Sequence, residues 1–207
     1  MPESRFSPEP YEEDEDLEKV TIFDDEGRSL DCYVENSLDL NNSTYILLMP
    51  VDSPIIILAM ENEDEDEEGE IGETIIIDDP EEIEQIFADA KAVLAEQDLI
   101  LKNTAYTLTV EGELPPLEDE NVISLELDEE ESKNTNNILE EDEQVEELQI
   151  LASFYNEQQH YNLCTPLSPL LFVAEVTSNN ELELLAPDNP ELEYILQELL
   201  FDEFDEN

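Results

Sequence analysis

Negative charge is the feature that most restricts how this chain can fold. Its 60 Asp and Glu residues stand against 6 Lys and Arg residues, which gives a formal net charge of −54 over 207 residues. Self-repulsion of this size opposes a compact state, and many chains of such composition stay disordered. Hydrophobic residues nevertheless make up 40% of the chain and stand in short runs, so we expect one or two small cores.

The same charge balance excludes several classes of protein. A chain with so few basic residues has no patch for a nucleic-acid backbone or an anionic membrane surface, so we expect no direct nucleic-acid binding. No apolar run approaches the roughly 20 residues of a transmembrane helix, and the acidic N-terminus does not resemble a secretory signal, so we expect no membrane insertion. The only cysteines, Cys32 and Cys164, make no disulfide framework, which favours a cytoplasmic protein.

Composition divides the chain into four segments. Residues 1–17 are acidic and contain prolines, and we predict a disordered arm there. Residues 18–127 are predicted to form a first β/α module with extra strands. Residues 128–147 are acidic with little to bury, which indicates a linker, and residues 148–207 are predicted to form a second, shorter β/α module.

Short apolar stretches separated by turn residues predict antiparallel strands in both modules. The turn around Gly27 joins the first two strands into a hairpin. Asp79 as a cap and Pro80 at the first helical position begin a helix whose apolar residues recur at helical spacing. Asn189 and Pro190 begin a second helix in the same way. The predicted strands cover residues 20–23, 30–34, 45–49, 55–59, 74–77, 106–110, 122–127, 148–154, 161–164, 170–174 and 182–185.

The two halves of the chain repeat one order of features. The segment Pro50–Pro54 is followed by Ile-Ile-Ile-Leu-Ala, and the segment Pro166–Pro169 is followed by Leu-Leu-Phe-Val-Ala. Each half then continues with a polar break, a strand, an acid-rich turn and a helix opened by an Asx-Pro-Glu triplet. The repeat predicts an α+β protein of two related small antiparallel β-sheet modules, each with one packed helix.

This order of elements resembles that of a family of small, strongly acidic bacterial proteins of unknown function. The resemblance in the first half rests on residues 20–27, 30–34, 45–59 and 75–94 and on the acidic loop between the last two ranges. From about Leu148 to Phe204 the chain resembles the second domain of longer cyanobacterial and plastid relatives. The resemblance implies a β-sheet domain with a helix, and it implies no catalytic residue.

No group of residues predicts a catalytic or metal site. Asp64 to Gly69 resembles the start of an EF-hand loop, but the twelfth position is Ile75 instead of the bidentate Glu that calcium requires. His160 and Cys164 lie four residues apart on a predicted strand, about 13 Å along it, which is too far for a nucleophile and its base. One His and two Cys do not match a zinc site. We therefore expect a protein that is not an enzyme, with no cofactor and no metal.

Two kinds of binding function remain compatible with the charge. One is a noncatalytic interaction module or assembly factor whose acidic surface attracts a basic protein partner. The alternative is a nucleic-acid mimic that occupies the nucleic-acid site of a basic protein. The sequence leaves open the partner's identity and the oligomeric state. The candidate interaction residues are Asp52, which lies between the prolines of the first motif, and the acidic loop residues Asp64, Glu65, Asp66, Glu67 and Glu68.

Overall fold

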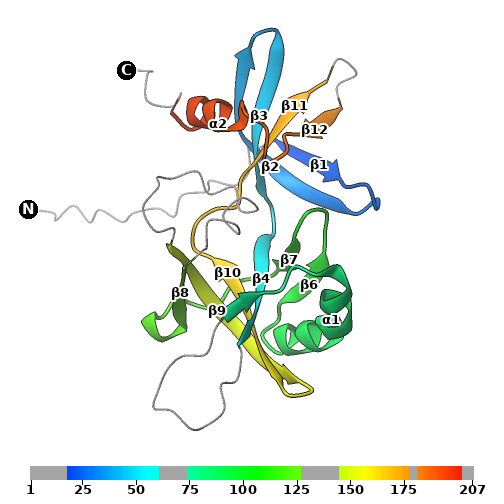
Figure 1. Ribbon diagram of the computed structural model, residues 1–207, viewed down its shortest axis with the longest axis vertical. Coiled ribbons are helices and arrows are strands. Elements are labelled where there is room, and N and C mark those ends of the chain that lie inside the picture. Colours follow the sequence, from blue (N-terminus) through cyan, green and yellow to red (C-terminus); the bar gives the residue numbers. More distant parts are fainter. Residues whose placement is uncertain (1–17, 61–73, 127–144, 178–180, 202–207) are drawn as a thin grey trace, which may run out of the picture.

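Two antiparallel sheets, each with a helix on one face, make up the fold (Figure 1). The structure is a computed structural model that describes residues 18–60, 74–126, 145–177 and 181–201. It confirms the predicted α+β class with two related modules. The predicted arm and the acidic loop lie outside the described residues, as does most of the predicted linker.

The first sheet has five strands in the order β1-β2-β3-β11-β12. Helix α2 (Leu192–Phe201) packs on it, and its apolar side chains form a core with those of β3 and β11. The strands are β1 (Lys19–Phe23), β2 (Ser29–Leu40), β3 (Ser43–Pro50), β11 (Phe172–Val176) and β12 (Leu182–Leu184).

The second sheet has seven strands, with β6-β7-β4-β10-β9-β8 in order and β5 paired with β4. Helix α1 (Pro80–Ala95) packs on it over the largest apolar core. A short 3-10 helix (Asp119–Asn121) precedes β8. The strands are β4 (Ser53–Met60), β5 (Thr74–Ile76), β6 (Ile100–Asn103), β7 (Leu108–Glu111), β8 (Val122–Glu126), β9 (Val145–Asn156) and β10 (Gln159–Pro166).

Each sheet is built from both halves of the chain. After β3 the chain leaves the first sheet, and β4 joins the second sheet beside β10. After β10 the chain crosses in the opposite direction, and β11 joins the first sheet beside β3. The two predicted modules therefore exchange their second parts, and neither sheet is complete without the other half of the chain.

The exchanged halves match element by element. The run β1-β2-β3-β4-β5-α1 repeats as β8-β9-β10-β11-β12-α2. Strands β2 and β9 both have 12 residues, β3 and β10 both have 8, and two residues join each pair, so Ser29–Pro50 corresponds to Val145–Pro166 without a gap. The register shifts at the same place in both hairpins: Glu35 of β2 and Leu151 of β9 are the residues that have no partner in the register. In this correspondence Leu47 matches Leu163, and Leu30 matches Glu146.

The capping residue and the proline that predicted the start of α1 have these roles in the structure. The Asp79 side chain accepts hydrogen bonds from the backbone N–H groups of Glu81 and Glu82, with Pro80 in the first turn. Such a cap satisfies donors that the helix leaves unpaired. At the second helix, Asn189 accepts from the N–H of Glu191, and α2 begins at Leu192.

Two elements differ from the sequence expectation. Strand β6 was not predicted, and it pairs with β7 to extend the second sheet. Strand β9 begins at Val145, three residues inside the segment predicted as a linker. These residues pair with β8, and Leu125 lies opposite Glu146. Their acidic composition predicts a solvated segment, but the pairing with β8 places them in the second sheet.

Strand exchange predicts that both sheets unfold together. Leu47 and Leu163 occupy matching positions on the helix-covered faces of the two sheets, and both are buried. Replacing either Leu with Ala should cost about 2–5 kcal/mol. We expect each variant to lower the midpoint of one common transition, measured by calorimetry. Two transitions, with each variant shifting a different one, would contradict this expectation.

Candidate functional site

A cavity of about 800 Å³ lies where the two sheets meet. Its walls include Ile56 of the second sheet, together with Phe172, Leu182 and Leu184 of the first. Ile56 packs on the apolar cluster of the second sheet that contains Leu148, and the other three pack on a cluster of the first sheet to which no residue of α2 belongs. The cavity therefore lies between sheet faces that the helices leave uncovered.

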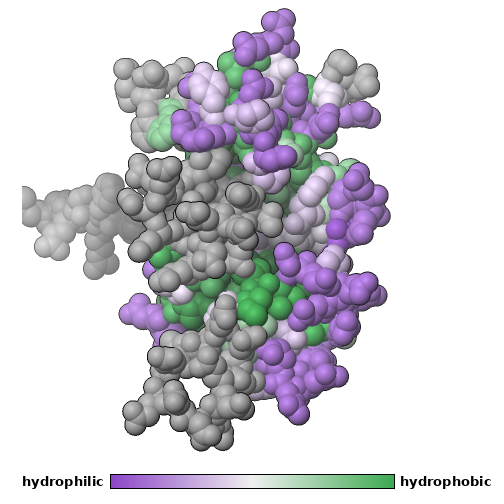
Figure 2. All heavy atoms as spheres, viewed as in Figure 1, coloured by the Kyte–Doolittle hydropathy of each residue, from purple (hydrophilic) through white to green (hydrophobic). Residues whose placement is uncertain are grey.

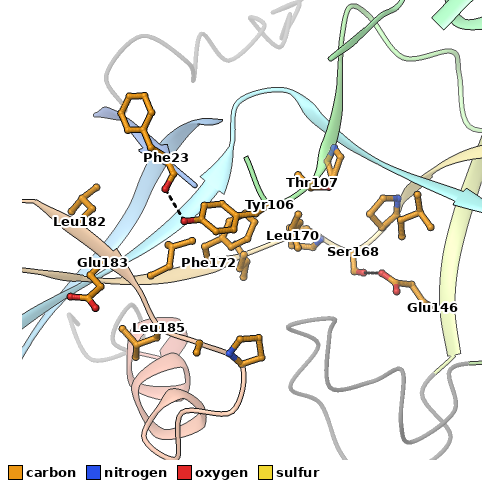
Figure 3. Close-up of a pocket in the computed structure, with 18 of the residues that line it drawn as sticks. Phe23, Tyr106, Thr107, Glu146, Ser168, Leu170, Phe172, Leu182, Glu183 and Leu185 are labelled. Carbon is orange, nitrogen blue, oxygen red and sulfur yellow. Dashed lines mark hydrogen bonds between the residues drawn. The ribbon is translucent and has the colours of Figure 1, made fainter. Parts of the chain in front are cut away.

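Glu146 of β9 is the one buried carboxylate in the described part of the chain. Its side chain lines the cavity, and the residue is 8% exposed. Oε1 accepts a hydrogen bond from the Ser168 hydroxyl at 3.1 Å, whereas Oε2 has no hydrogen-bond partner among the described residues. Figure 3 shows the two side chains directed toward each other at one end of the cavity. Since buried polar groups are normally hydrogen-bonded, the open oxygen of this carboxyl group is placed to receive a donor.

Aromatic residues form another part of the cavity wall. The Tyr106 hydroxyl donates a hydrogen bond to the Phe23 carbonyl at 2.8 Å, and the Tyr106 ring lies 6.1 Å from that of Phe172 (Figure 3). Burial, followed by the charges of Asp24 and Asp25, raises the pKa of Tyr106, so its phenol stays protonated and continues to donate. Tyr106 belongs to the β6–β7 turn, which thereby connects the second sheet to β1.

The structure places only one of the predicted interaction residues. Asp52 lies in the β3–β4 turn, and its Oδ2 is 2.8 Å from the Lys102 ammonium. Lys102 also pairs with Glu111 at 2.8 Å, and the hydrogen bonds that its ammonium donates to Asp52 and Glu111 raise the Lys102 pKa. Asp52 therefore links the turn to β6 and shares the positive charge of Lys102 with Glu111. Asp64, Glu65, Asp66, Glu67 and Glu68 lie outside the described residues.

Both cysteines are buried, and the single histidine of the sequence stacks on an aromatic ring. Cys164 is buried in the second sheet, and burial raises the pKa of its thiol to about 12. Burial, with the nearby charge of Asp31, raises the pKa of Cys32 to about 12 as well. The His160 ring stacks on Tyr155, with 4.6 Å between the ring centroids.

Hydrophilic residues cover much of the described surface that Figure 2 shows. Figure 2 shows hydrophilic residues over the lower right of the molecule, where α1 lies, next to a smaller apolar area. Within the described residues, no helix is long and apolar enough to cross a membrane.

Sequence reasoning missed the two residues that define the cavity's polar end. Glu146 falls in the segment predicted as an acidic linker, and Ser168 lies in the second proline motif. The repeat carried a signal, because Glu146 takes the place of Leu30, a buried residue of the first half. A gap-free alignment of residues 29–50 with 145–166 would have shown an acid at a core position.

The burial and the high pKa values of the two thiols predict that they react slowly with thiol reagents in the folded protein. The thiolate is the reactive form of cysteine, so neither Cys32 nor Cys164 should react with a disulfide reagent in the native protein at pH 8. We expect both to react once the chain is unfolded in urea, as measured by the absorbance of the released thiol. Rapid native reaction of one thiol would contradict the burial described here.

The cavity also predicts an unusual stability effect. Replacing Glu146 with Leu, the residue at the matching position of the first half, should stabilise the protein by about 1–3 kcal/mol, because it removes an unsatisfied buried acceptor. Denaturant unfolding measures the change. Glu84→Leu, on the exposed surface of α1, is the control and should change stability little. A loss of stability in Glu146→Leu would show that the carboxylate has a structural partner.

Comparison with known proteins gives two family matches that meet just after α1. Residues 25–95 match the model of a family described as "Protein of unknown function (DUF1292)", and residues 98–203 match that of "Protein of unknown function (DUF3727)". Searches of the curated proteins and of the solved structures found no match. The second family match spans just over half of the 207 residues. By that match, the chain belongs to the family described as DUF3727, and its first half is similar to the family described as DUF1292.

Proposed function

We propose that this protein is a noncatalytic interaction module that binds a basic protein partner. One observation carries the proposal. Ion pairs among the described residues engage only four carboxylates, those of Asp24, Glu26, Asp52 and Glu111. The remaining negative charge of this part of the chain has no salt-bridge partner within it.

Three of the four basic residues in the described ranges, all except Lys91, add to this argument. Arg28 binds Asp24 at 2.6 Å and Glu26 at 3.2 Å, and Lys102 is held between Asp52 and Glu111. Lys19 places its ammonium 4.9 Å from the centre of the Tyr33 ring. These cations are used within the fold, so an excess of carboxylates is left to steer a positively charged partner toward the surface.

Charge of this kind predicts binding that weakens with salt. Immobilised full-length protein should retain a basic protein from a nuclease-treated lysate at low salt and release it when the ionic strength exceeds about 0.15 M, where surface charges are screened beyond roughly 8 Å. A polyglutamate resin of matched charge density is the control for nonspecific exchange. A partner retained by the protein and not by that resin is the expected result.

Added DNA separates the two binding functions. A partner of an interaction module should stay bound in DNA, whereas the partner of a nucleic-acid mimic should be displaced by it. Displacement would replace the present proposal with mimicry. Retention of the same proteins by both resins, or of none, would overturn it.

A further inference from the structure

We propose that the cavity between the two sheets binds one lysine or arginine side chain of the partner, with its cationic group on Glu146. This inference rests on the proposed function, because it assumes that the partner is a basic protein. It adds the site, the residue that confers recognition and the chemistry of the group that enters.

The first argument is the incomplete pairing of Glu146. The residue is 92% buried, yet only Oε1 has a hydrogen-bond partner, the Ser168 hydroxyl, and Oε2 has none among the described residues. Two other buried polar side chains, by contrast, are hydrogen-bonded. Gln149 donates to the Pro115 carbonyl at 2.9 Å, and Asn162 accepts from Ser153 at 2.7 Å. An ionised partner would complete the one open acceptor with a charge-assisted hydrogen bond.

The second argument comes from the repeat. Leu30, the residue that matches Glu146, is 2% exposed and belongs to the apolar core of the first sheet. Two positions after Leu30 and Glu146, the matching residues are Cys32 and Leu148, and both are buried and apolar. The fold therefore accepts an apolar side chain at this position. A carboxylate there costs stability without serving the fold, and functional sites commonly carry such a cost.

The third argument is the sign of the charge around the cavity. Its lining contains three carboxylates, those of Asp25, Glu146 and Glu183, and no Lys, Arg or His. Asp25 and Glu183 are exposed, and Glu146 is buried. In Figure 3, Glu183 lies at the opposite end of the labelled residues from Glu146. The arrangement attracts a cation at the exposed part and gives it a buried anion to bind.

The fourth argument is the match between the walls and an alkyl stem. Between the carboxylates the lining is largely apolar, and it includes Ile56, Leu170 and Phe172. Lysine and arginine bury their methylene chains against apolar surface while their charged ends find polar groups. The Tyr106 and Phe172 rings add faces on which a cation is favoured.

A metal ion is the competing cationic ligand, and the site does not suit it. Calcium takes six to eight oxygen ligands, and magnesium requires near-octahedral coordination. Within residues 18–60, 74–126, 145–177 and 181–201, no three His, Cys, Asp or Glu side chains are grouped to hold a metal ion. The open Oε2 of Glu146, with the Ser168 hydroxyl beside Oε1, instead offers acceptors for some of the N–H groups of one ammonium or guanidinium.

Small probes test the site without the partner. Nα-acetyl-lysine methylamide and Nα-acetyl-arginine methylamide would be titrated into the methyl-labelled full chain and followed by NMR, with Nα-acetyl-norleucine methylamide as the uncharged match. We expect one or both cationic probes to shift Ile56 and Leu170, and to bind about tenfold or more tightly than norleucine. Such a ratio corresponds to one charge-assisted hydrogen bond. Equal binding of all three probes, or shifts confined to α1, would overturn the proposal.

Two substitutions locate the charge. Glu146→Gln and Glu146→Leu should each weaken the cationic probe by about tenfold or more and leave norleucine unchanged. Glu84→Gln makes the same change of charge on the exposed surface of α1 and should have little effect. Unchanged probe affinity in a folded Glu146→Gln protein would overturn the proposal. Calcium chloride that shifts the same methyl groups at micromolar concentration would do so as well, in favour of a metal site.

The partner experiment separates this inference from the proposed function. Capture of a basic protein by wild type and Glu146→Gln with equal affinity would overturn the cavity's role and leave the interaction module intact. The cationic probes could bind at Glu146 while the protein captures no basic partner. That result would overturn the proposed function and would identify the cavity as a site for small amines. Loss of both the probe and the partner in Glu146→Gln is the result that we expect.

Discussion

The reciprocal exchange of strands is the constraint on which the rest of the structure depends. Strand β4 reaches the second sheet by pairing with β10, and β11 reaches the first sheet by pairing with β3. A chain with a net charge of −54 has to offset strong self-repulsion. It does so with apolar cores on both sheets, and the helix-covered core of each sheet requires residues from both halves. The exchange therefore makes the compact state of one module depend on that of the other, although each module alone contains few strands.

The exchange also explains why a cavity exists at the centre. Two prolines flank each crossing between the sheets. Pro50 ends β3 and Pro54 is the second residue of β4, whereas Pro166 ends β10 and Pro169 follows it. Proline has no N–H to donate to a ladder, so such positions suit the ends of strands. Three of these prolines line the cavity. The sheet faces on that side are not covered by α1 or α2, and the β6–β7 turn bridges part of the gap through Tyr106. The cavity thus follows from the way in which the two halves cross.

Local features of the fold could be predicted from the sequence, and long-range pairing could not. The hairpin at Gly27, the cap at Asp79 and the repeat of the proline motifs rest on residues close in sequence, and the structure contains all three elements. Alternation of apolar and polar residues tells which face of a strand is buried and does not name its neighbour. No local sequence feature shows whether β4 pairs with its chain neighbour β3 or with the distant strand β10. Glu146 was missed for a related reason, since its acidic neighbours hide the fact that β8 pairs with it and draws it into the sheet.

The two halves of the repeat differ in character at the buried, equivalent positions Leu30 and Glu146. Two copies of one module start with equivalent positions, and a position that only supports packing has no reason to become acidic in a buried sheet. Leu30 keeps the packing role, within the cluster of the first sheet. Glu146 instead lies at the cavity, with Ser168 of the second proline motif on one oxygen and nothing described on the other. Duplication followed by exchange supplies a second copy of the fold whose stability is shared with the first. That shared stability lets one buried position carry a carboxyl group with an unpartnered oxygen, which a single small module of this acidity would tolerate poorly.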